Sequence, residues 1–266
     1  MSHLRVRPTS KSGRVIHVTP QSAGWTYVGF DLHKLAKGAG AEGKDSAREC
    51  CLVLVSGKAK ITADGKDFGL LGTRMSPFEG KPTSVYVPAG AAWSVAAETE
   101  VELAVCSSPG KPGARPARLI SSSDCSQEVR GTGTNTRYVT NILPETADAD
   151  SLLVVEVITP GGHTSSYPPH KHDVDDFPRE TYLEETYYHR LKPAQGFAFQ
   201  RVYTDDRSLD EALVIEDGDL TLVPRGYHPV AATHGYDVYY LNTMAGPKKA
   251  WRFHNEPAHE WLVKKT

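Results

Sequence analysis

The chain has 266 residues, of which 39% are apolar and 23% are charged, and its formal net charge is -2 at pH 7. It contains no run of about 18 apolar residues, which a membrane-spanning helix needs. The nearly balanced charge also provides no basic surface for a phosphate backbone. The composition therefore predicts a soluble globular protein whose partners include neither a membrane nor a nucleic acid.

Eight segments have the composition of β-strands, because they are rich in β-branched and aromatic residues and are bounded by Gly, Pro, Asp or Ser. In chain order they are residues 51–55, 58–62, 84–87, 101–105, 152–158, 197–203, 219–223 and 238–241. Helical periodicity is nearly absent, although residues 205–213 could hold about two helical turns. The pattern predicts an all-β fold of two barrels or sandwiches.

An internal repeat supports two lobes. The sequence of residues 85–97 is echoed by residues 220–232, with a Val-Pro-x-Gly turn in each copy. The segments 107–113 and 121–136 are rich in Ser, Gly, Pro and Thr, which is typical of linkers. We therefore predict a duplicated β-barrel, with domains at residues 1–130 and 131–266.

The amino terminus and the cysteines indicate the compartment. Early basic residues are followed by no apolar segment, so we predict no secretory signal. The four cysteines include no C-x-x-C pair, and the adjacent Cys50 and Cys51 could form a disulfide only with strain. We expect reduced cysteines and a cytoplasmic location.

Histidines in the second half have the spacing of a metal site. His170 and His172 stand in Pro-Pro-His-Lys-His, and His228 follows a Pro-Arg-Gly-Tyr turn. Alternate residues of a strand share one face, so His170 and His172 can both face a barrel interior and bind one ion at about 2.1 Å. Since no histidine lies between His33 and His163, the first domain cannot build the same site.

A carboxylate ligand is also expected, and six acidic residues follow His172: Asp173, Asp175, Asp176, Glu180, Glu184 and Glu185. Residues 173–179 look like an inserted loop, and strand alternation separates the last two candidates. Glu184 and Glu185 must point to opposite faces of their strand, and the sequence by itself leaves the choice open.

The motif resembles the cupin pattern, in which H-x-H and a glutamate precede Gly-x5-Pro-x-Gly and a final histidine. Gly218, Pro224 and Gly226 match in full, although only one residue separates Gly226 from His228 and the glutamate follows later than usual. The chain further resembles the 5-deoxy-glucuronate isomerase family of inositol catabolism, over residues 24–30, 166–173, 180–190, 196–211, 226–231, 239–247 and 259–261. The resemblance implies a bicupin with its metal in the C-terminal barrel, and it favours Glu185 as the carboxylate ligand.

The implied reaction is the conversion of 5-deoxy-D-glucuronate to 5-dehydro-2-deoxy-D-gluconate, an aldose–ketose isomerisation through an enediolate. One divalent ion, Zn²⁺ or Mn²⁺, would stabilise the negative charge of that enediolate. The metal ligands expected are His170, His172, Glu185 and His228.

Proton transfer and recognition of the substrate carboxylate need further side chains. Candidates for the general base are Tyr187, His189, Tyr203 and Glu184. The carboxylate calls for a cation, for which Arg201 and Arg190 are favoured over Lys171 and Arg225. Of these residues, we predict functional roles for Tyr187, Arg201 and Tyr203.

Two other functions fit the same ligands. The site could hold Fe²⁺ and activate dioxygen, or the barrel could bind carbohydrate without catalysis. The expected partner is a small-molecule sugar acid, and a homo-oligomer is left open.

Overall fold

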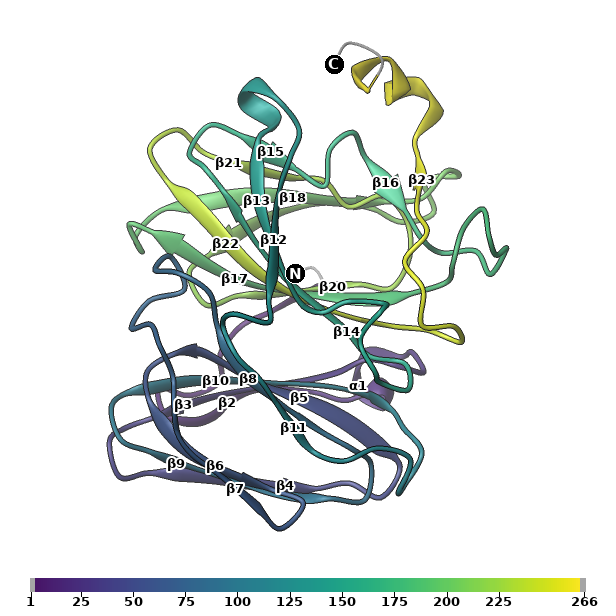
Figure 1. Cartoon of the computed structure of the whole chain (residues 1–266). Helices are drawn as coiled ribbons and strands as arrows, with labels where there is room; N and C mark the ends of the chain where they lie inside the picture. Colours follow the sequence, from purple (N-terminus) through teal and green to yellow (C-terminus); the bar gives the residue numbers. More distant parts are fainter. Residues whose placement is uncertain (1–2, 264–266) are drawn as a thin grey trace. The chain divides into compact units, whose positions relative to one another are not determined.

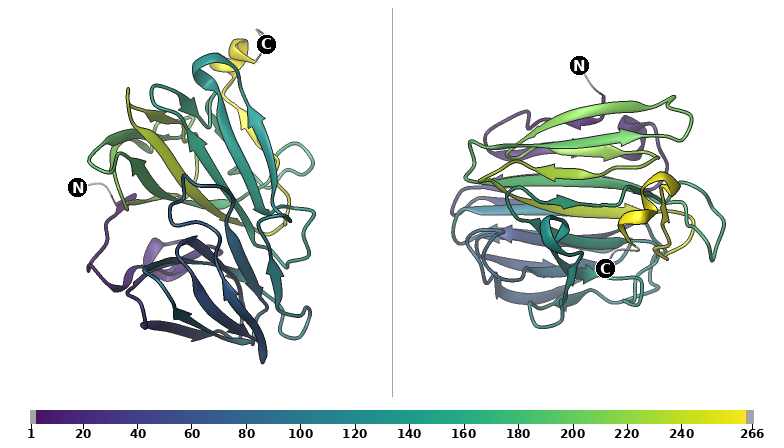
Figure 2. Two further views of the ribbon diagram at one scale, coloured as in Figure 1. Left: turned by 60° about the vertical axis from the view of Figure 1, so that its left-hand side comes forward. Right: turned by 90° about the horizontal axis from the view of Figure 1, so that it is seen from above.

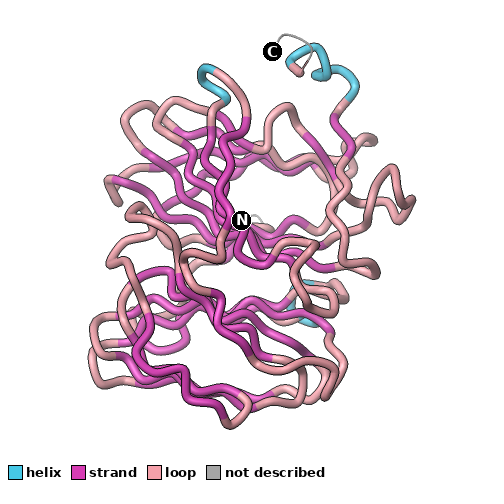
Figure 3. Tube along the Cα trace, viewed as in Figure 1, coloured by secondary structure: helices cyan, strands magenta, loops and turns pink. Residues whose placement is uncertain are grey.

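The computed structural model describes residues 3–263, and strands dominate it (Figure 3). Strands account for 50% of the residues and helices for 5%. The helical segments are α1 (Pro20–Ala23) and two short 3₁₀ helices, η1 (Gly133–Asn135) and η2 (Pro257–Leu262). The prediction of an all-β fold is confirmed. Within residues 3–263, none of the helices has the length and apolar content to cross a membrane.

The chain divides into two compact units, each built from more than one stretch of sequence. Within the described residues, the N-terminal unit comprises 8–126 and 140–155, and the C-terminal unit comprises 3–7, 127–139 and 156–263. The division into domains at residues 1–130 and 131–266 was inferred from the sequence repeat, and it remains a prediction.

Two sheets form the N-terminal unit, and they are drawn mainly in purple and blue in Figure 1. The six-stranded sheet has the order β11 (Arg118–Ile120), β8 (Thr83–Val87), β5 (Arg48–Ser56), β10 (Val101–Pro109), β3 (Gly29–Leu35), β2 (Gly13–Val18). The four-stranded sheet has the order β4 (Gly40–Lys44), β9 (Ala92–Ala97), β6 (Ala59–Ala63), β7 (Lys66–Leu71).

Aliphatic side chains from both of these sheets share one core, which includes Leu52, Leu54, Ile61 and Val95. Alternation explains why these strands form, since every second residue of β6 is buried and the residues between are exposed. The four cysteines are buried and form no disulfide bond, in agreement with the expectation of reduced thiols. Burial raises the pKa of the Cys51 thiol well above its ordinary value, so this thiol stays protonated.

Three sheets contain the strands of the C-terminal unit, and the largest of them also includes residues 140–143 and 153–155. The largest has the order β1 (Arg5–Val6), β20 (Leu220–Val223), β17 (Glu184–Lys192), β22 (Asp237–Ala245), β14 (Leu153–Thr159), β13 (Arg137–Leu143), β12 (Ser126–Arg130). A four-stranded sheet has the order β15 (Thr164–Ser165), β21 (Val230–Ala232), β18 (Phe197–Tyr203), β19 (Asp210–Glu216). A two-stranded sheet pairs β16 (His170–Lys171) with β23 (His254–Asn255). Figure 2 shows β12 and β13 as a long teal pair joined by η1.

All eight segments predicted as strands overlap strands of the structure. The two repeated sequences form the same strand–turn–strand unit, β8 and β9 in one copy and β20 and β21 in the other. The suggestion of helical turns at residues 205–213 is wrong. Leu213 and Ile215 alternate with exposed residues along β19, so this segment has the two-residue period of a strand and pairs with β18.

Candidate metal centre

Three histidines from two separate stretches converge inside the C-terminal unit. His170, His172 and His228 are buried, and one imidazole nitrogen from each lies within 4.8 Å of the others. The ring centroid of His228 is 5.0 Å from those of both His170 and His172. Within residues 3–263, this is the one place where three side chains of metal-ligating type meet. The sequence spacing thus predicted a real convergence.

The pairing of two short strands explains how the first two histidines reach the same point. β16 pairs with β23, with His170 opposite Asn255, and His172 follows two residues later. The ring of His170 packs on Phe253 at 4.7 Å between centroids. The intervening Lys171 points away from the histidines, as the alternation of a strand requires.

His228 is presented by a tight turn after β20. Gly226 has a φ of 88°, and a Cβ at this position would lie 2.4 Å from the carbonyl oxygen of Tyr203, so only glycine fits. His228 Nδ1 donates a hydrogen bond to the Gly226 carbonyl oxygen at 2.8 Å. This bond fixes the tautomer and leaves Nε2 with a bare lone pair directed into the cluster.

Glu185 completes the cluster from β17. Its Oε2 lies 3.0 Å from His172 Nε2 and 3.3 Å from His228 Nε2. Residues 185, 187 and 189 share one face of β17, whereas Glu184 lies on the opposite face. The glutamate that the family resemblance favoured is therefore the one whose carboxylate faces the histidines.

The donor set fits a divalent cation. His172 Nδ1 donates to the Leu183 carbonyl oxygen at 3.0 Å, so its Nε2, like that of His228, can present a lone pair to Glu185. His228 Nε2 is buried and makes no hydrogen bond. The imidazole lone pairs and the negative carboxylate that they face repel one another unless a proton or a cation lies between them. An ion bound at about 2.1 Å by nitrogen ligands would satisfy them with small shifts of the side chains.

Electrostatics in the cluster keep the carboxylate ionised. Burial raises the pKa of Glu185, but the adjacent His172 and His228 imidazoles, which stabilise the carboxylate when they are protonated, outweigh burial and hold that pKa below its ordinary value. Burial lowers the pKa of His170 well below its ordinary value, and the neighbouring His228 and His172 lower it further. For His172 the pKa is raised, because the contact with Glu185 outweighs burial. The site thus has an anionic carboxylate, a neutral imidazole at His170, and an imidazole at His172 that must release any proton on Nε2 before it can bind a metal.

Tyrosines and serines stand beside the histidines. The ring of Tyr187 meets His228 edge-on at 5.7 Å, and its hydroxyl lies 3.1 Å from Ser166 Oγ. Tyr240 packs against Tyr187 at 4.9 Å between centroids. Burial, followed by the charge of Glu185, raises the pKa of Tyr187 well above its ordinary value. Tyr187 therefore keeps its proton and can donate a hydrogen bond.

His189 lies further along the same face of β17. It stacks on Tyr187 at 5.9 Å, and its Nε2 is 3.2 Å from Gln200 Oε1 and 3.3 Å from Thr221 Oγ1. Burial lowers the pKa of His189 to about 3, so this imidazole is neutral at physiological pH.

Two of the residues predicted from sequence lie elsewhere. Arg201 makes two hydrogen bonds of 2.7 Å to the carboxylate of Asp210 and stacks on Tyr203, whose hydroxyl donates to Glu256. Their neighbour Gln200 points the other way and donates to the His228 carbonyl oxygen. Because alternate residues of β18 face opposite sides, the structure does not bring Arg201 and Tyr203 to the histidines.

The other cations proposed for the carboxylate are also engaged. Arg190 binds Asp217 at 2.8 Å, and Lys171 binds Asp173 at 2.6 Å. Arg225 donates to Ser208 Oγ at 3.4 Å.

The sequence reasoning missed Arg137, at the start of β13 in a segment that reads as linker. Tyr138 is exposed and Val139 is buried, so the alternation directs Arg137 inward. Residues 135 and 136 are tied to the loop before His170, through the Asn135 amide to the Tyr167 carbonyl and His163 Nδ1 to the Thr136 carbonyl. The positive charge of Arg137 adds to the lowering of the His170 pKa.

The first repeat has no such cluster. In β5, Cys50 is opposite Val87, which is the register position that Glu185 takes opposite Val223 in β17. A buried thiol with a raised pKa therefore replaces the carboxylate.

Comparisons with known proteins extend over almost the whole chain. Residues 4–262 match the model of the KduI/IolB family. A relative from Geobacillus kaustophilus, named 5-deoxy-glucuronate isomerase, is 55% identical over 255 residues, which is 96% of this chain and 92% of the relative. A relative of the same name from Bacillus subtilis strain 168 is 46% identical over 272 residues and the full length of both chains.

Solved structures agree on the fold. The crystal structure of an IolB-like protein from Salmonella typhimurium has a TM-score of 0.96 and 54% identity, covering 98% of this chain and 100% of that chain. Oxalate decarboxylase from Lactobacillus farciminis has a TM-score of 0.68 at 14% identity, covering 99% and 91%, and this likeness concerns the fold alone. The bicupin prediction is confirmed by these neighbours.

Proposed function

The chain belongs to the KduI/IolB family, and from this premise we propose that it isomerises the aldose 5-deoxy-D-glucuronate to the ketose 5-dehydro-2-deoxy-D-gluconate in inositol catabolism. The main support is the buried cluster of three imidazoles around Glu185, in a chain that matches named isomerases over nearly its whole length. An aldose–ketose shift develops negative charge on the substrate oxygens, and such charge needs a positive or hydrogen-bonding environment.

We propose His170, His172, Glu185 and His228 as the ligands of one divalent ion, Zn²⁺ or Mn²⁺. When bound, the ion would supply a Lewis acid that stabilises charge on oxygen without changing its oxidation state. The protein's own contribution is orientation, because the carbonyl groups of Leu183 and Gly226 hold the two Nδ1 atoms and so aim both Nε2 atoms inward.

Tyr187 is the proposed hydrogen-bond donor to the substrate. Its hydroxyl stays protonated, contacts Ser166, and lies on the face of β17 that carries Glu185. His189 is less suited to carry a proton, because a pKa of about 3 makes it a weak base at neutral pH.

Arg137 is the proposed partner of the substrate carboxylate, in place of Arg201. Two N–H groups of Arg201 already bind the Asp210 carboxylate, whereas Arg137 donates to the Asn135 carbonyl oxygen at 3.1 Å and pairs with no carboxylate among residues 3–263. Burial lowers the pKa of Arg137, which means that its charge is already partly desolvated before any ligand binds. A partly buried cation that contacts no carboxylate directly is a favourable site for a substrate carboxylate.

The test is an NMR assay of metal-loaded protein with 5-deoxy-glucuronate in deuterated water. We expect the ketose to form with wild type and not with His228→Ala, which loses a ligand. Arg179→Met is the matched control, because Arg179 is exposed and, among residues 3–263, its guanidinium pairs only with the exposed Asp176. Absence of turnover by metal-replete wild type, with tight binding of the sugar acid, would instead support a binding protein.

Oxygen consumption that requires iron would support the dioxygenase alternative. The cytoplasmic location and the homo-oligomer remain predictions.

A further inference from the structure

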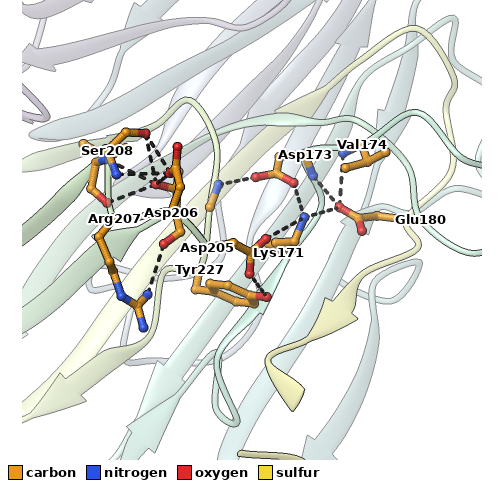
Figure 4. Close-up of polar contacts among 12 residues, drawn as sticks. Lys171, Asp173, Val174, Glu180, Asp205, Asp206, Arg207, Ser208 and Tyr227 are labelled. Atoms are coloured by element: carbon orange, nitrogen blue, oxygen red, sulfur yellow. Dashed lines mark hydrogen bonds and ion pairs between the residues drawn. The ribbon is translucent and has the colours of Figure 1, made fainter. Parts of the chain in front are cut away.

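The ammonium group of Lys171, a buried residue between His170 and His172 in the sequence, lies at the centre of a polar network (Figure 4). Its Nζ is 2.6 Å from Asp173 Oδ1 and 3.6 Å from both Glu180 Oε1 and Asp205 Oδ2. The side chains of Lys171, Asp173 and Glu180 are 10%, 14% and 10% exposed, so these charges interact with little screening by solvent, whereas Asp205 is 68% exposed and its charge is more screened. One cation therefore holds three carboxylates that come from three different positions in the sequence.

Two of these carboxylates bind the turn that presents His228. The second oxygen of Asp173 accepts a hydrogen bond from the Gly226 amide at 2.9 Å, and Asp205 Oδ1 accepts one from the Tyr227 hydroxyl at 2.8 Å. His228 Nδ1 donates to the carbonyl oxygen of the same Gly226 at 2.8 Å. A continuous path of polar contacts thus runs from Lys171 to the imidazole of His228.

The third carboxylate fixes the backbone on the other side of the network. Glu180 Oε1 accepts hydrogen bonds from the amides of Asp173 at 2.8 Å and Val174 at 3.1 Å. These hydrogen bonds fix the backbone immediately after His172. The Asp173 carboxylate, which binds the His228 turn, is therefore held next to the segment that carries His170 and His172.

Charge balance makes the lysine necessary to the arrangement. Without the ammonium group, the carboxylates of Asp173, Glu180 and Asp205 would face one another in a partly buried site, and like charges at this separation repel. The hydrogen bonds to Gly226 and Tyr227 depend on the positions of two of those carboxylates.

We propose that Lys171 is a positioning residue for the metal centre: through Asp173 and Asp205 it fixes the turn 224–228, so that His228 Nε2 meets the imidazoles of His170 and His172. The inference rests on the metal centre of the proposed function and adds to it the group that sets its geometry. Partners of this outer kind typically change metal affinity by about 10- to 100-fold.

The test compares Zn²⁺ affinity, measured by competition with a chromophoric chelator, and the visible absorption of the Co²⁺-loaded protein, which reports ligand geometry. In Lys171→Met we expect the Zn²⁺ dissociation constant to rise roughly 10- to 100-fold and the Co²⁺ spectrum to change. Lys171→Arg, which keeps the charge, should recover part of the affinity. Arg179→Met, which removes an exposed cation from the loop after His172, should change neither the Zn²⁺ affinity nor the Co²⁺ spectrum.

Tyr227→Phe keeps the inference testable if Lys171→Met does not fold, because it removes one hydroxyl and no charge. We expect it to weaken Zn²⁺ binding several-fold. Wild-type affinity and an unchanged Co²⁺ spectrum in folded Lys171→Met, or in Tyr227→Phe where the former does not fold, would overturn the role of Lys171 alone. A wild-type protein that binds no metal would overturn the metal centre and the inference together.

Discussion

Replacing Arg137 by methionine tests how the substrate carboxylate is held. Methionine keeps an apolar stem of similar length but removes the charge. No carboxylate among residues 3–263 forms an ion pair with Arg137, so the change strands no buried anion and should leave the fold intact. A hydrogen bond to a charged group contributes about 1.5 to 3 kcal/mol. A loss of about 3 kcal/mol in substrate binding corresponds to a rise in KM of roughly 100-fold.

The turnover number should change much less, because the carboxylate is remote from the carbons between which hydrogen moves. The assay is steady-state isomerisation of 5-deoxy-glucuronate and of a neutral analogue in which a hydroxymethyl group replaces the carboxylate. Wild type should strongly prefer the acid, and Arg137→Met should lose most of that preference.

Arg201→Met is the informative comparison, since Arg201 was the arginine predicted from sequence. Its guanidinium is paired with Asp210, so we expect its loss to have little effect on KM. A KM that rises about 100-fold in Arg201→Met and stays unchanged in Arg137→Met would refute the reasoning from strand alternation.

Further predictions follow from the same geometry. Glu185→Gln should weaken Zn²⁺ binding by more than the roughly 10- to 100-fold expected for residues that only orient a ligand. Glu184→Gln, on the opposite face of β17, should retain Zn²⁺ binding. Equal losses of affinity in the two variants, measured by chelator competition, would contradict the assignment of Glu185. Burial lowers the pKa of His189 to about 3 from 6.5, so between these values the unfolded chain binds a proton that the folded chain does not. Stability of the metal-free protein should therefore fall as the pH is lowered, by up to about 1.4 kcal/mol per unit from this group, and urea titrations at pH 6 and 5 should show a smaller fall in His189→Gln. Gly226→Ala should cost on the order of 2 kcal/mol of unfolding free energy, because its φ is positive and the new Cβ would meet the Tyr203 carbonyl oxygen; a change below about 0.5 kcal/mol would count against this.

The local pattern of the sequence determined the strands and the three histidines that converge. Two-residue alternation marks the strands, and it also places His170 and His172 on one face, because the direction of a side chain depends only on its position along the strand. The repeated Val-Pro-x-Gly turn pointed to His228, which follows it closely. The turn can be recognised in the sequence because its last position has a positive φ and therefore favours glycine, here Gly226.

Which face of a strand becomes the interior was decided by tertiary pairing. Alternation says that Glu184 and Glu185 differ, but only the pairing of β17 with β20 and β22 decides that Glu185 faces the histidines. The same cause turns Arg201 outward, since β18 lies between β19 and β21 with Gln200 directed inside.

Contacts between residues far apart in the sequence also bring side chains near the histidines that no local sequence pattern indicates. Arg137 belongs to a stretch with the composition of a linker, and it reaches the centre because its neighbours bond to the loop before His170. Lys171 acquires its role through carboxylates up to 34 residues away along the chain, at Asp173 and Asp205. Spacing in the sequence therefore specified the three histidines that converge, whereas the folded sheets selected the charges that surround them, because charges interact through space and not along the chain.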